Sequence, residues 1–350
     1  MTPRSMWVLA ETVLVEAPYL VFIGEAHDAL AAKTGFALVD WCPDRVLGQL
    51  RLPGCATDLG VPEFTPEEAA EQGARTLVIG TVSPGGALPT QWLELLCRAL
   101  DAGMALASGM HQRLIHVPQL VEHALGNTER LIDVRHHGGS LSVGSGQPRP
   151  GKRLLTVGTD CSIGKKYTAL ALARGLQLRG LAADFRATGQ TGILIAGEGI
   201  AVDAVVSDFV SGAAEVLSPA AADHHWDVVE GQGSLLHPSF AGVTLGLLQG
   251  SQPDAFVVCH EPTRTRMRNV DTPMPTPGEI IYLTIKLGRR TNPDIRCVGI
   301  ALNLSEIRAV EASALKIRLE AEHGVPVTDP VAEGVEPILD HLLADEVGQP

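Results

Sequence analysis

Short apolar runs alternate with helix-like segments along the whole chain. Runs such as Pro18–Gly24 and Thr76–Gly80 are almost entirely apolar, as strands are when a sheet is covered on both faces. Between such runs, apolar residues recur at helical spacing. This alternation predicts an α/β fold with parallel sheets, because parallel strands need a long crossover connection, usually a helix.

The first half of the chain is expected to form one such domain. Thr65, followed by Pro66 and by Glu68 three residues on, is a signature of a helix N-terminus. The expected strands are Pro18–Gly24, Arg45–Leu52, Thr76–Gly80, Met104–Ser108 and Leu131–Val134. The expected helices are Glu25–Val39, Thr65–Gln72, Thr90–Ala102 and Pro118–Leu125.

A break in the pattern predicts the domain boundary. Between His136 and Lys152, Gly, Ser and Pro dominate and no apolar period survives. We therefore expect an N-terminal extension (1–17), a first domain (18–137), a linker (138–152) and a second domain (153–350). In the second domain, the expected strands are Arg153–Val157, Ala182–Arg186, Trp226–Val229, Ala255–Cys259 and Arg296–Leu302. Helices are expected from Lys165 onward and at Asp203–Ala214, Pro277–Leu287, Glu306–His323 and Val335–Leu343.

Composition narrows the possible functions. The 350 residues suit two domains, and 45% hydrophobic with 19% charged residues is typical of globular proteins. A net charge of −13 argues against nucleic-acid or anionic-membrane binding. Six scattered cysteines without a C-x-x-C pair argue against a disulfide framework or a thiolate zinc site. With no signal peptide or membrane span in evidence, we expect a soluble, cytoplasmic protein without a bound metal.

One loop of the second domain predicts an anion site. A strand leads into a loop bounded by Gly158 and Gly164, and a helix begins at Lys165. Such a loop turns successive N–H groups and a helix N-terminus toward a phosphate, and Lys165 would pair with a phosphate oxygen. The expected cofactor-binding residues are Gly158, Thr159, Asp160, Cys161, Ser162, Ile163, Gly164, Lys165 and Lys166.

Lys166 separates this loop from those of ordinary Mg-ATP enzymes. Their lysine is followed by Ser or Thr, whose hydroxyl holds Mg²⁺, whereas a second ammonium repels that cation. A phosphate ligand that needs no Mg²⁺, such as coenzyme A, therefore fits better.

Further polar residues follow other strands, where ligands bind in open α/β sheets. Glu230 ends one strand and is our first choice for a general base, ahead of Asp160 and His260. The expected substrate-binding residues are Arg186, Thr188, Gln190, Gln232, Arg264 and Arg266. Loops after strands of the first domain (Arg51–Cys55, Ser83–Gly86 and Ser108–His111) are expected to line a cleft between the domains.

Several long motifs resemble one family. LPGC, ASGMH, VGTDCSIGKKYTAL, DFRATGQTGILIAGEG, EGQGSLLHPSF and CHEPTRTRMR are similar to the DgcN-type D-glutamate N-acetyltransferases, over about Pro18–Leu343. The resemblance implies a Rossmann-like N-terminal domain followed by a P-loop NTPase-like C-terminal domain with a parallel sheet. It also implies acetyl transfer from acetyl-CoA to D-glutamate, a first step of D-amino-acid catabolism completed by a partner dehydrogenase.

A wider resemblance keeps an alternative open. Gly158–Asp160, Gly164–Lys165 and Glu230–Gly233 are similar to dethiobiotin synthetase and other ATP-dependent P-loop enzymes, where the equivalent carboxylate holds Mg²⁺. The alternatives are therefore a Mg-ATP-dependent ligase or kinase acting on a small carboxylate, and a nucleotide- or CoA-sensing regulator. We expect small-molecule partners, an acidic D-amino acid and CoA, and a homo-oligomer.

Overall fold

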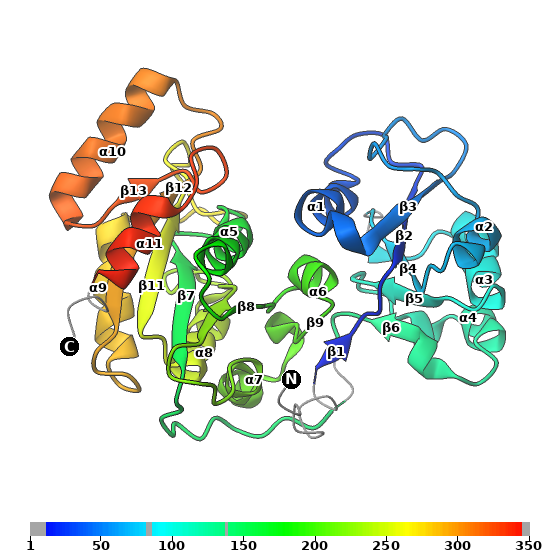
Figure 1. The fold of residues 1–350 in the computed structure, drawn as a ribbon, viewed down its shortest axis with the longest axis horizontal. Helices are drawn as coiled ribbons and strands as arrows, with labels where there is room; N and C mark the ends of the chain where they lie inside the picture. Colours follow the sequence, from blue (N-terminus) through cyan, green and yellow to red (C-terminus); the bar gives the residue numbers. More distant parts are fainter. Residues whose placement is uncertain (1–11, 82–85, 137–138, 345–350) are drawn as a thin grey trace. The chain divides into compact units, whose positions relative to one another are not determined.

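A computed structural model describes residues 12–81, 86–136 and 139–344 (Figure 1). The chain divides into two compact units, residues 1–140 with 189–204, and residues 141–188 with 205–350. Each unit is built on one parallel sheet, so the α/β fold predicted from the sequence is confirmed. Among the described residues, no helix is long and apolar enough to cross a lipid bilayer.

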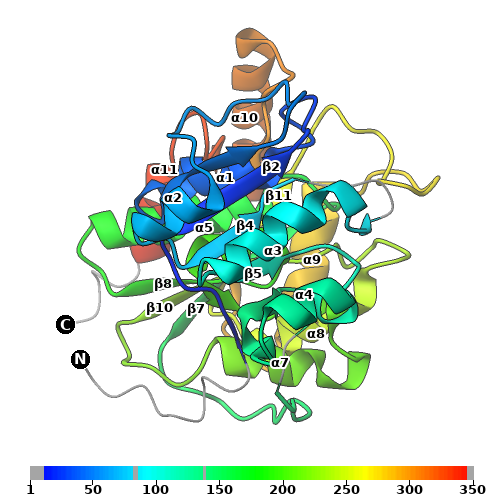
Figure 2. The ribbon, with the colours of Figure 1, turned by 90° about the vertical axis from the view of Figure 1, so that its right-hand side faces the viewer.

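The first unit has a five-stranded sheet covered by helices on both faces. The sheet order is β3 (Val46–Arg51), β2 (Tyr19–Gly24), β4 (Thr76–Ile79), β5 (Ala105–Ser108) and β6 (Leu131–Asp133). Figure 2 shows three helices side by side over one face: α2 (Pro66–Glu71), α3 (Leu93–Asp101) and α4 (Pro118–His123). Every residue of β2 is buried, as its uninterrupted apolar run predicts.

The second unit has a six-stranded sheet in which all strands run parallel. Its order is β13 (Val327–Thr328), β12 (Arg296–Leu302), β11 (Ala255–His260), β7 (Lys152–Gly158), β10 (Trp226–Val229) and β8 (Ala183–Arg186). One face packs on α5 (Lys165–Leu178) and α11 (Glu336–Leu343). The other packs on α7 (Val210–Leu217), α8 (Ala241–Ser251), α9 (Pro277–Gly288) and α10 (Ala309–His323). Because β7 lies in the interior of the sheet, the loop that follows it lies near the middle of the sheet's carboxyl edge.

Residues 189–204, from the second half of the sequence, belong to the first unit. Helix α6 (Gln190–Ala196) packs against α1 (Lys33–Trp41), and β9 (Glu198–Gly199) pairs antiparallel with β1 (Val13–Leu14). In Figure 1, α6 and β9 therefore carry the green of mid-sequence although they group with the first unit. The sequence pattern places the residues of α6 and β9 in the second domain, whereas they belong to the first unit, and β1 lies in the expected extension (1–17).

Most strands predicted from the sequence are present, and side-chain contacts explain where two of the predicted helices begin. The capping box of α2 is confirmed, since Thr65 and Glu68 each accept a backbone N–H of the other. The helix expected at Glu25–Val39 begins only at Lys33, because the Asp28 carboxylate accepts the N–H of Ala31 and holds a turn.

Helix α8 and helix α6 are two elements that the pattern did not predict. Both contain glycine, which is unfavourable inside helices. In α8 the glycines allow close packing on α7, since a Cβ at Gly250 would lie 2.1 Å from the Ser211 carbonyl oxygen. The helix expected at Asp203–Ala214 is correspondingly displaced, and α7 spans Val210–Leu217.

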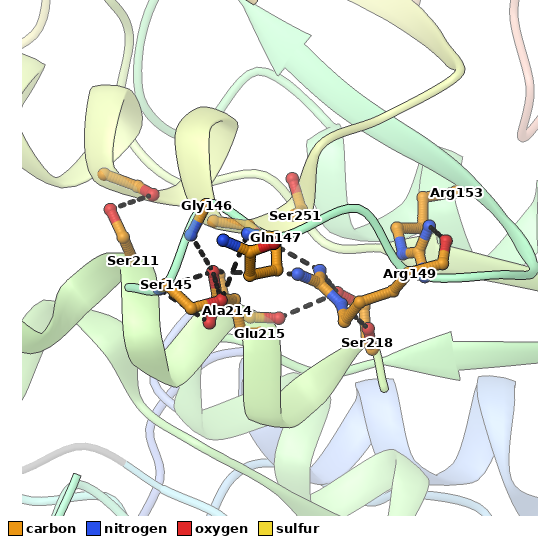
Figure 3. Close-up of polar contacts among 12 residues, drawn as sticks. Ser145, Gly146, Gln147, Arg149, Arg153, Ser211, Ala214, Glu215, Ser218 and Ser251 are labelled. Atoms are coloured by element: carbon orange, nitrogen blue, oxygen red, sulfur yellow. Dashed lines mark hydrogen bonds and ion pairs between the residues drawn. The ribbon is translucent and has the colours of Figure 1, made fainter. Parts of the chain in front are cut away.

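The expected linker is fastened to the second unit (Figure 3). The Glu215 carboxylate on α7 accepts the N–H groups of Ser145 and Gly146 at 2.9 Å. The Arg149 guanidinium donates to the carbonyl oxygens of Ser218 and Gly250. The described residues 139–151 contain no helix or strand, as the composition predicted, yet side chains hold them in place.

Candidate active site

The glycine loop follows β7 at the carboxyl edge of the second sheet, between β10 and β11. Gly164 has φ 109°, a left-handed conformation that favours glycine, and Ser162 has φ 53°. In the described part of the chain, nothing in the protein accepts the backbone N–H groups of residues 162–165. Four free N–H groups at the start of a 14-residue helix fit an anion such as a phosphate.

Lys165 lies under this loop. Its side chain is buried, with 6% of the residue exposed, and its Nζ donates to the Asp160 carbonyl oxygen at 2.6 Å. Burial lowers the pKa of Lys165, while the carboxylates of Asp160 and Glu230 oppose that shift. Gly231 makes room for this arrangement, because a Cβ there would lie 1.6 Å from the Thr156 carbonyl oxygen and 3.1 Å from Lys165 Cδ.

Asp160 is fully buried and anchors the loop. Its Oδ1 accepts the N–H of Cys161, and its Oδ2 accepts from Arg264 Nη1 at 2.8 Å and from the Arg268 N–H at 2.7 Å. Arg264 also donates to the Cys161 carbonyl oxygen and pairs with Glu261 at 2.6 Å. These contacts occupy Asp160 and tie Arg264 to the outside of the loop, so both act in shaping it.

Glu230 lies at the end of β10, close to Lys165. Only 4% of the residue is exposed, and its Oε2 accepts the N–H of Thr188 at 3.0 Å. The Thr188 hydroxyl donates to the Glu230 carbonyl oxygen and accepts from Gln232 Nε2 at 3.0 Å. The structure therefore brings Glu230, Thr188 and Gln232 together beside the loop, as their positions after neighbouring strands suggested.

His260 ends β11 on the other side of β7. Its Nδ1 and the Thr159 hydroxyl lie 3.0 Å apart and share a hydrogen bond. Burial lowers the pKa of His260 to about 4, so the ring is neutral at pH 7. A neutral imidazole of such low pKa is a weak proton acceptor compared with the base that pH 7 chemistry favours.

The pKa of His260 predicts an acid-sensitive fold. An unfolded histidine has a pKa near 6.5, so below that pH the unfolded chain binds a proton that the folded one does not. Stability should therefore fall as the pH drops from about 6.5 toward 4. Between pH 7.5 and pH 5, His260→Asn should lose about 2 kcal/mol less unfolding free energy than the parent protein. Urea unfolding at both pH values measures this, and equal losses in the two proteins would contradict it.

The remaining predicted residues lie apart from the loop or outside it. Arg186 turns back along the sheet and pairs with Asp227 at 2.6 Å and Asp184 at 3.0 Å. Arg266 has a side chain that is 60% exposed and pairs with Asp271. The Lys166 ammonium lies over the Tyr167 ring, 4.4 Å from its centroid. Gln190 lies on α6 and lines a cavity of the first unit.

Among the described residues, two clusters have the ligand types of a metal site, and neither fits one. The first contains Asp160, which already accepts from Arg264 and two N–H groups. In the second, Asp184 and Asp227 are bridged by the Arg186 guanidinium, whose charge would repel a cation. The Ser/Thr ligand of Mg²⁺ is also replaced by Lys166.

Three groups that shape or extend the site were not predicted from the sequence. The main-chain N–H of Arg268 binds Asp160, and the Thr156 hydroxyl accepts the N–H of Gly231 at 2.9 Å. No sequence pattern marks such contacts. Lys33, the only lysine before Lys152, lines the first unit's cavity, and its isolation in the sequence was a usable signal.

Family models match both halves of the chain. Residues 50–137 match the N-terminal, Rossmann-like domain of DUF1611, and residues 142–339 match its C-terminal P-loop domain, both described as domains of unknown function. A crystal structure of a DUF1611 family protein from Anabaena variabilis covers 93% of this chain and 99% of its own. It is 33% identical, with a TM-score of 0.77.

Two curated relatives of this chain are named for an enzyme activity. A protein named D-glutamate N-acetyltransferase from Pseudoalteromonas sp. is 45% identical and covers 94% of this chain and 99% of its own length. A second protein of that name, from Tritonibacter scottomollicae, is 46% identical and covers 95% of this chain and 100% of its own. The family models confirm the Rossmann-like and P-loop domains expected from the sequence.

Proposed function

This chain belongs to the DUF1611 family, and we propose that it is a D-glutamate N-acetyltransferase that takes its acetyl group from acetyl-CoA. The observation that carries the acceptor is the 45–46% identity to relatives of that name over nearly the whole chain. Two features of the glycine loop support the donor: its N–H groups can bind a phosphate, and Lys166 stands where Mg-ATP enzymes have the Ser or Thr that holds Mg²⁺. Acetyl-CoA carries phosphates that such a loop can bind, and acetyl transfer from its thioester requires no Mg²⁺.

The glycine loop would hold a phosphate of the donor. Its four free N–H groups and the buried Lys165 ammonium supply hydrogen bonds and positive charge to an anion. Asp160 and Arg264 keep the loop in shape by bridging its backbone, so the N–H groups stay aligned before a ligand arrives. Such preorganisation spares the cost of ordering the loop on binding.

The chemical step needs a base. A thioester supplies an activated acetyl carbonyl carbon, and the amine nitrogen of glutamate attacks it only when it carries a free electron pair. The C–N bond forms as the C–S bond breaks. One proton leaves the nitrogen, and the thiolate released takes up one proton.

Glu230 is the residue that we assign to this proton transfer. It lies beside Lys165 and the loop, and glutamine at this position would keep its contact with Thr188. Asp160 is engaged on both oxygens, and His260 is a weaker base because of its low pKa. General-base catalysis of this kind contributes about 100- to 10,000-fold to a rate.

The Cys161 thiol is expected to play no covalent part. Burial raises its pKa, so it is protonated at neutral pH, whereas the thiolate is the nucleophilic form. Cys161→Ala should therefore retain activity within about threefold, the spread of ordinary packing effects. Steady-state rates measure this, and mass spectrometry of the parent protein with acetyl-CoA checks for an acetylated thiol. An acetyl group on Cys161 that is passed to D-glutamate would overturn this assignment.

Calorimetric titration tests the donor directly. We expect acetyl-CoA to bind without added Mg²⁺, and CoA to bind through the same loop. Lys165→Met should weaken both interactions. Tight binding of Mg-ATP together with no binding of acetyl-CoA would contradict the proposal and favour an ATP-dependent enzyme.

A further inference from the structure

The first unit contains a cavity of about 590 Å³, well within the range of small-molecule sites. Ile79 at the end of β4 and the residues Gly109–His111 after β5 line it. It therefore opens at the carboxyl ends of the strands, where open α/β sheets bind ligands. Neither the glycine loop nor Glu230 belongs to it.

The lining of this cavity is cationic. Its lining includes the ammonium of Lys33, the guanidinium of Arg135 and the imidazole of His111, and no aspartate or glutamate among the described residues. In the described residues, nothing accepts a hydrogen bond from the Lys33 ammonium. The Arg135 guanidinium donates to the Asp203 carboxylate at 2.6 Å, which fixes its position. A guanidinium has five N–H donors, so others can still bind a ligand. A ligand of this cavity should carry negative charge.

Lys33 and Arg135 come from different parts of the first sheet. Lys33 begins α1, which follows β2, and Arg135 follows β6. Strands β4 and β5 lie between β2 and β6 in the sheet order. A ligand with anionic groups at both ends would pair with both cations, whereas a compact anion has a single charged group to offer them. This favours a small dicarboxylate.

Helix α6 supplies neutral polar groups to the same cavity. Gln190 and Thr191 line it together with Thr34 and Thr81. Gly109 allows α6 to come this close, because a Cβ at Gly109 would lie 3.0 Å from Gln190 Cβ. Amide and hydroxyl groups can hydrogen-bond an amine or a carboxylate and so add orientation to charge.

We propose that this cavity binds the dicarboxylate amino acid that accepts the acetyl group, with Lys33 and Arg135 pairing with its two carboxylates. The chemical identity of the ligand rests on the proposed function, while the location and charge of the site rest on the geometry alone. Charge-assisted hydrogen bonds of this kind contribute about 1.5–3 kcal/mol each, or about 10- to 150-fold in affinity.

Glutarate is the probe that separates binding from chemistry, because it has both carboxylates and no amine to acetylate. Calorimetric titration of the full chain with glutarate should give binding that weakens at least about tenfold in Lys33→Gln and in Arg135→Gln. Arg75→Gln is the matched control, since Arg75 is an exposed cation just before β4, at the opposite end of that strand. It should bind glutarate as the parent protein does.

The same variants should raise the KM for D-glutamate and leave the KM for acetyl-CoA unchanged. Glutarate binding that is absent from the parent protein, or equal in the parent and Lys33→Gln, would overturn the assignment of the cavity. If Arg135→Gln fails to fold, Lys33→Gln decides alone, because no hydrogen bond joins the Lys33 ammonium to any residue that the structure describes. Failure to acetylate D-glutamate would overturn the proposed function but not a glutarate site that depends on Lys33.

Discussion

Replacing Glu230 by glutamine should lower kcat for D-glutamate acetylation by about 100- to 10,000-fold. Glutamine has the same shape and can still accept the N–H of Thr188, but it cannot take a proton from the attacking amine. The KM for acetyl-CoA should change little, because we assign Glu230 to the proton of the amine and not to a phosphate of the donor. Steady-state kinetics with each substrate varied in turn measures both quantities.

The pH profile distinguishes a base from a structural residue. In the parent protein, the acid limb of kcat reports the essential base, and that limb should disappear in Glu230→Gln. Glu230→Asp keeps a carboxylate and should retain more activity than the glutamine variant. A glutamine variant with more than about a tenth of parental kcat would show that Glu230 does not take the proton.

Replacing Lys165 by methionine should raise the dissociation constant of acetyl-CoA by about 10- to 150-fold, the value of one charged hydrogen bond to a phosphate. Methionine fills most of the buried space that Lys165 occupies, so the loss should come from charge rather than from a cavity. Calorimetry measures the constant, and unfolding curves check that the fold is kept.

Lys166→Met is the matched control for this experiment. Lys166 carries the same charge one residue away, but its ammonium lies over the Tyr167 ring. Its removal should weaken acetyl-CoA binding less than the removal of Lys165. Equal effects of the two variants would mean that general positive charge attracts the donor, and unchanged binding in Lys165→Met would remove the loop from the site.

Sequence patterns were most informative where the local sequence decides the conformation. The buried strands β2 and β11 are apolar throughout most of their length, and the α2 cap requires only Thr65 and Glu68. The loop at Gly158–Lys165 could likewise be placed after a strand and before a helix. These features depend on residues close together in the chain.

The role of each charged group depended instead on partners distant in the sequence. Arg264 was expected to bind substrate, yet it donates to the buried carboxylate of Asp160, 104 residues away, at 2.8 Å. Arg186 was expected at the ligand edge, yet cross-strand pairing with Asp227 directs it along the sheet. A cation after a strand predicts an anion nearby but cannot tell a substrate carboxylate from one of the protein's own.

Helix α6 illustrates a second limit. Its sequence, QTGILIA, contains a glycine and little helical period, and contacts with α1 stabilise it in the first unit. Because tertiary packing overrides local propensity, neither the helix nor its place beside Lys33 could be predicted. The cavity that we assign to the acceptor therefore emerges only from the three-dimensional structure.

Thiol release from acetyl-CoA in the presence of single D- and L-amino acids tests the central claim most directly. We predict that D-glutamate gives one thiol and one N-acetylglutamate per turnover, without Mg²⁺ or ATP, and that L-glutamate reacts much more slowly. Absence of thiol release with every amino acid, together with ADP formation from Mg-ATP and a small carboxylate, would contradict the account.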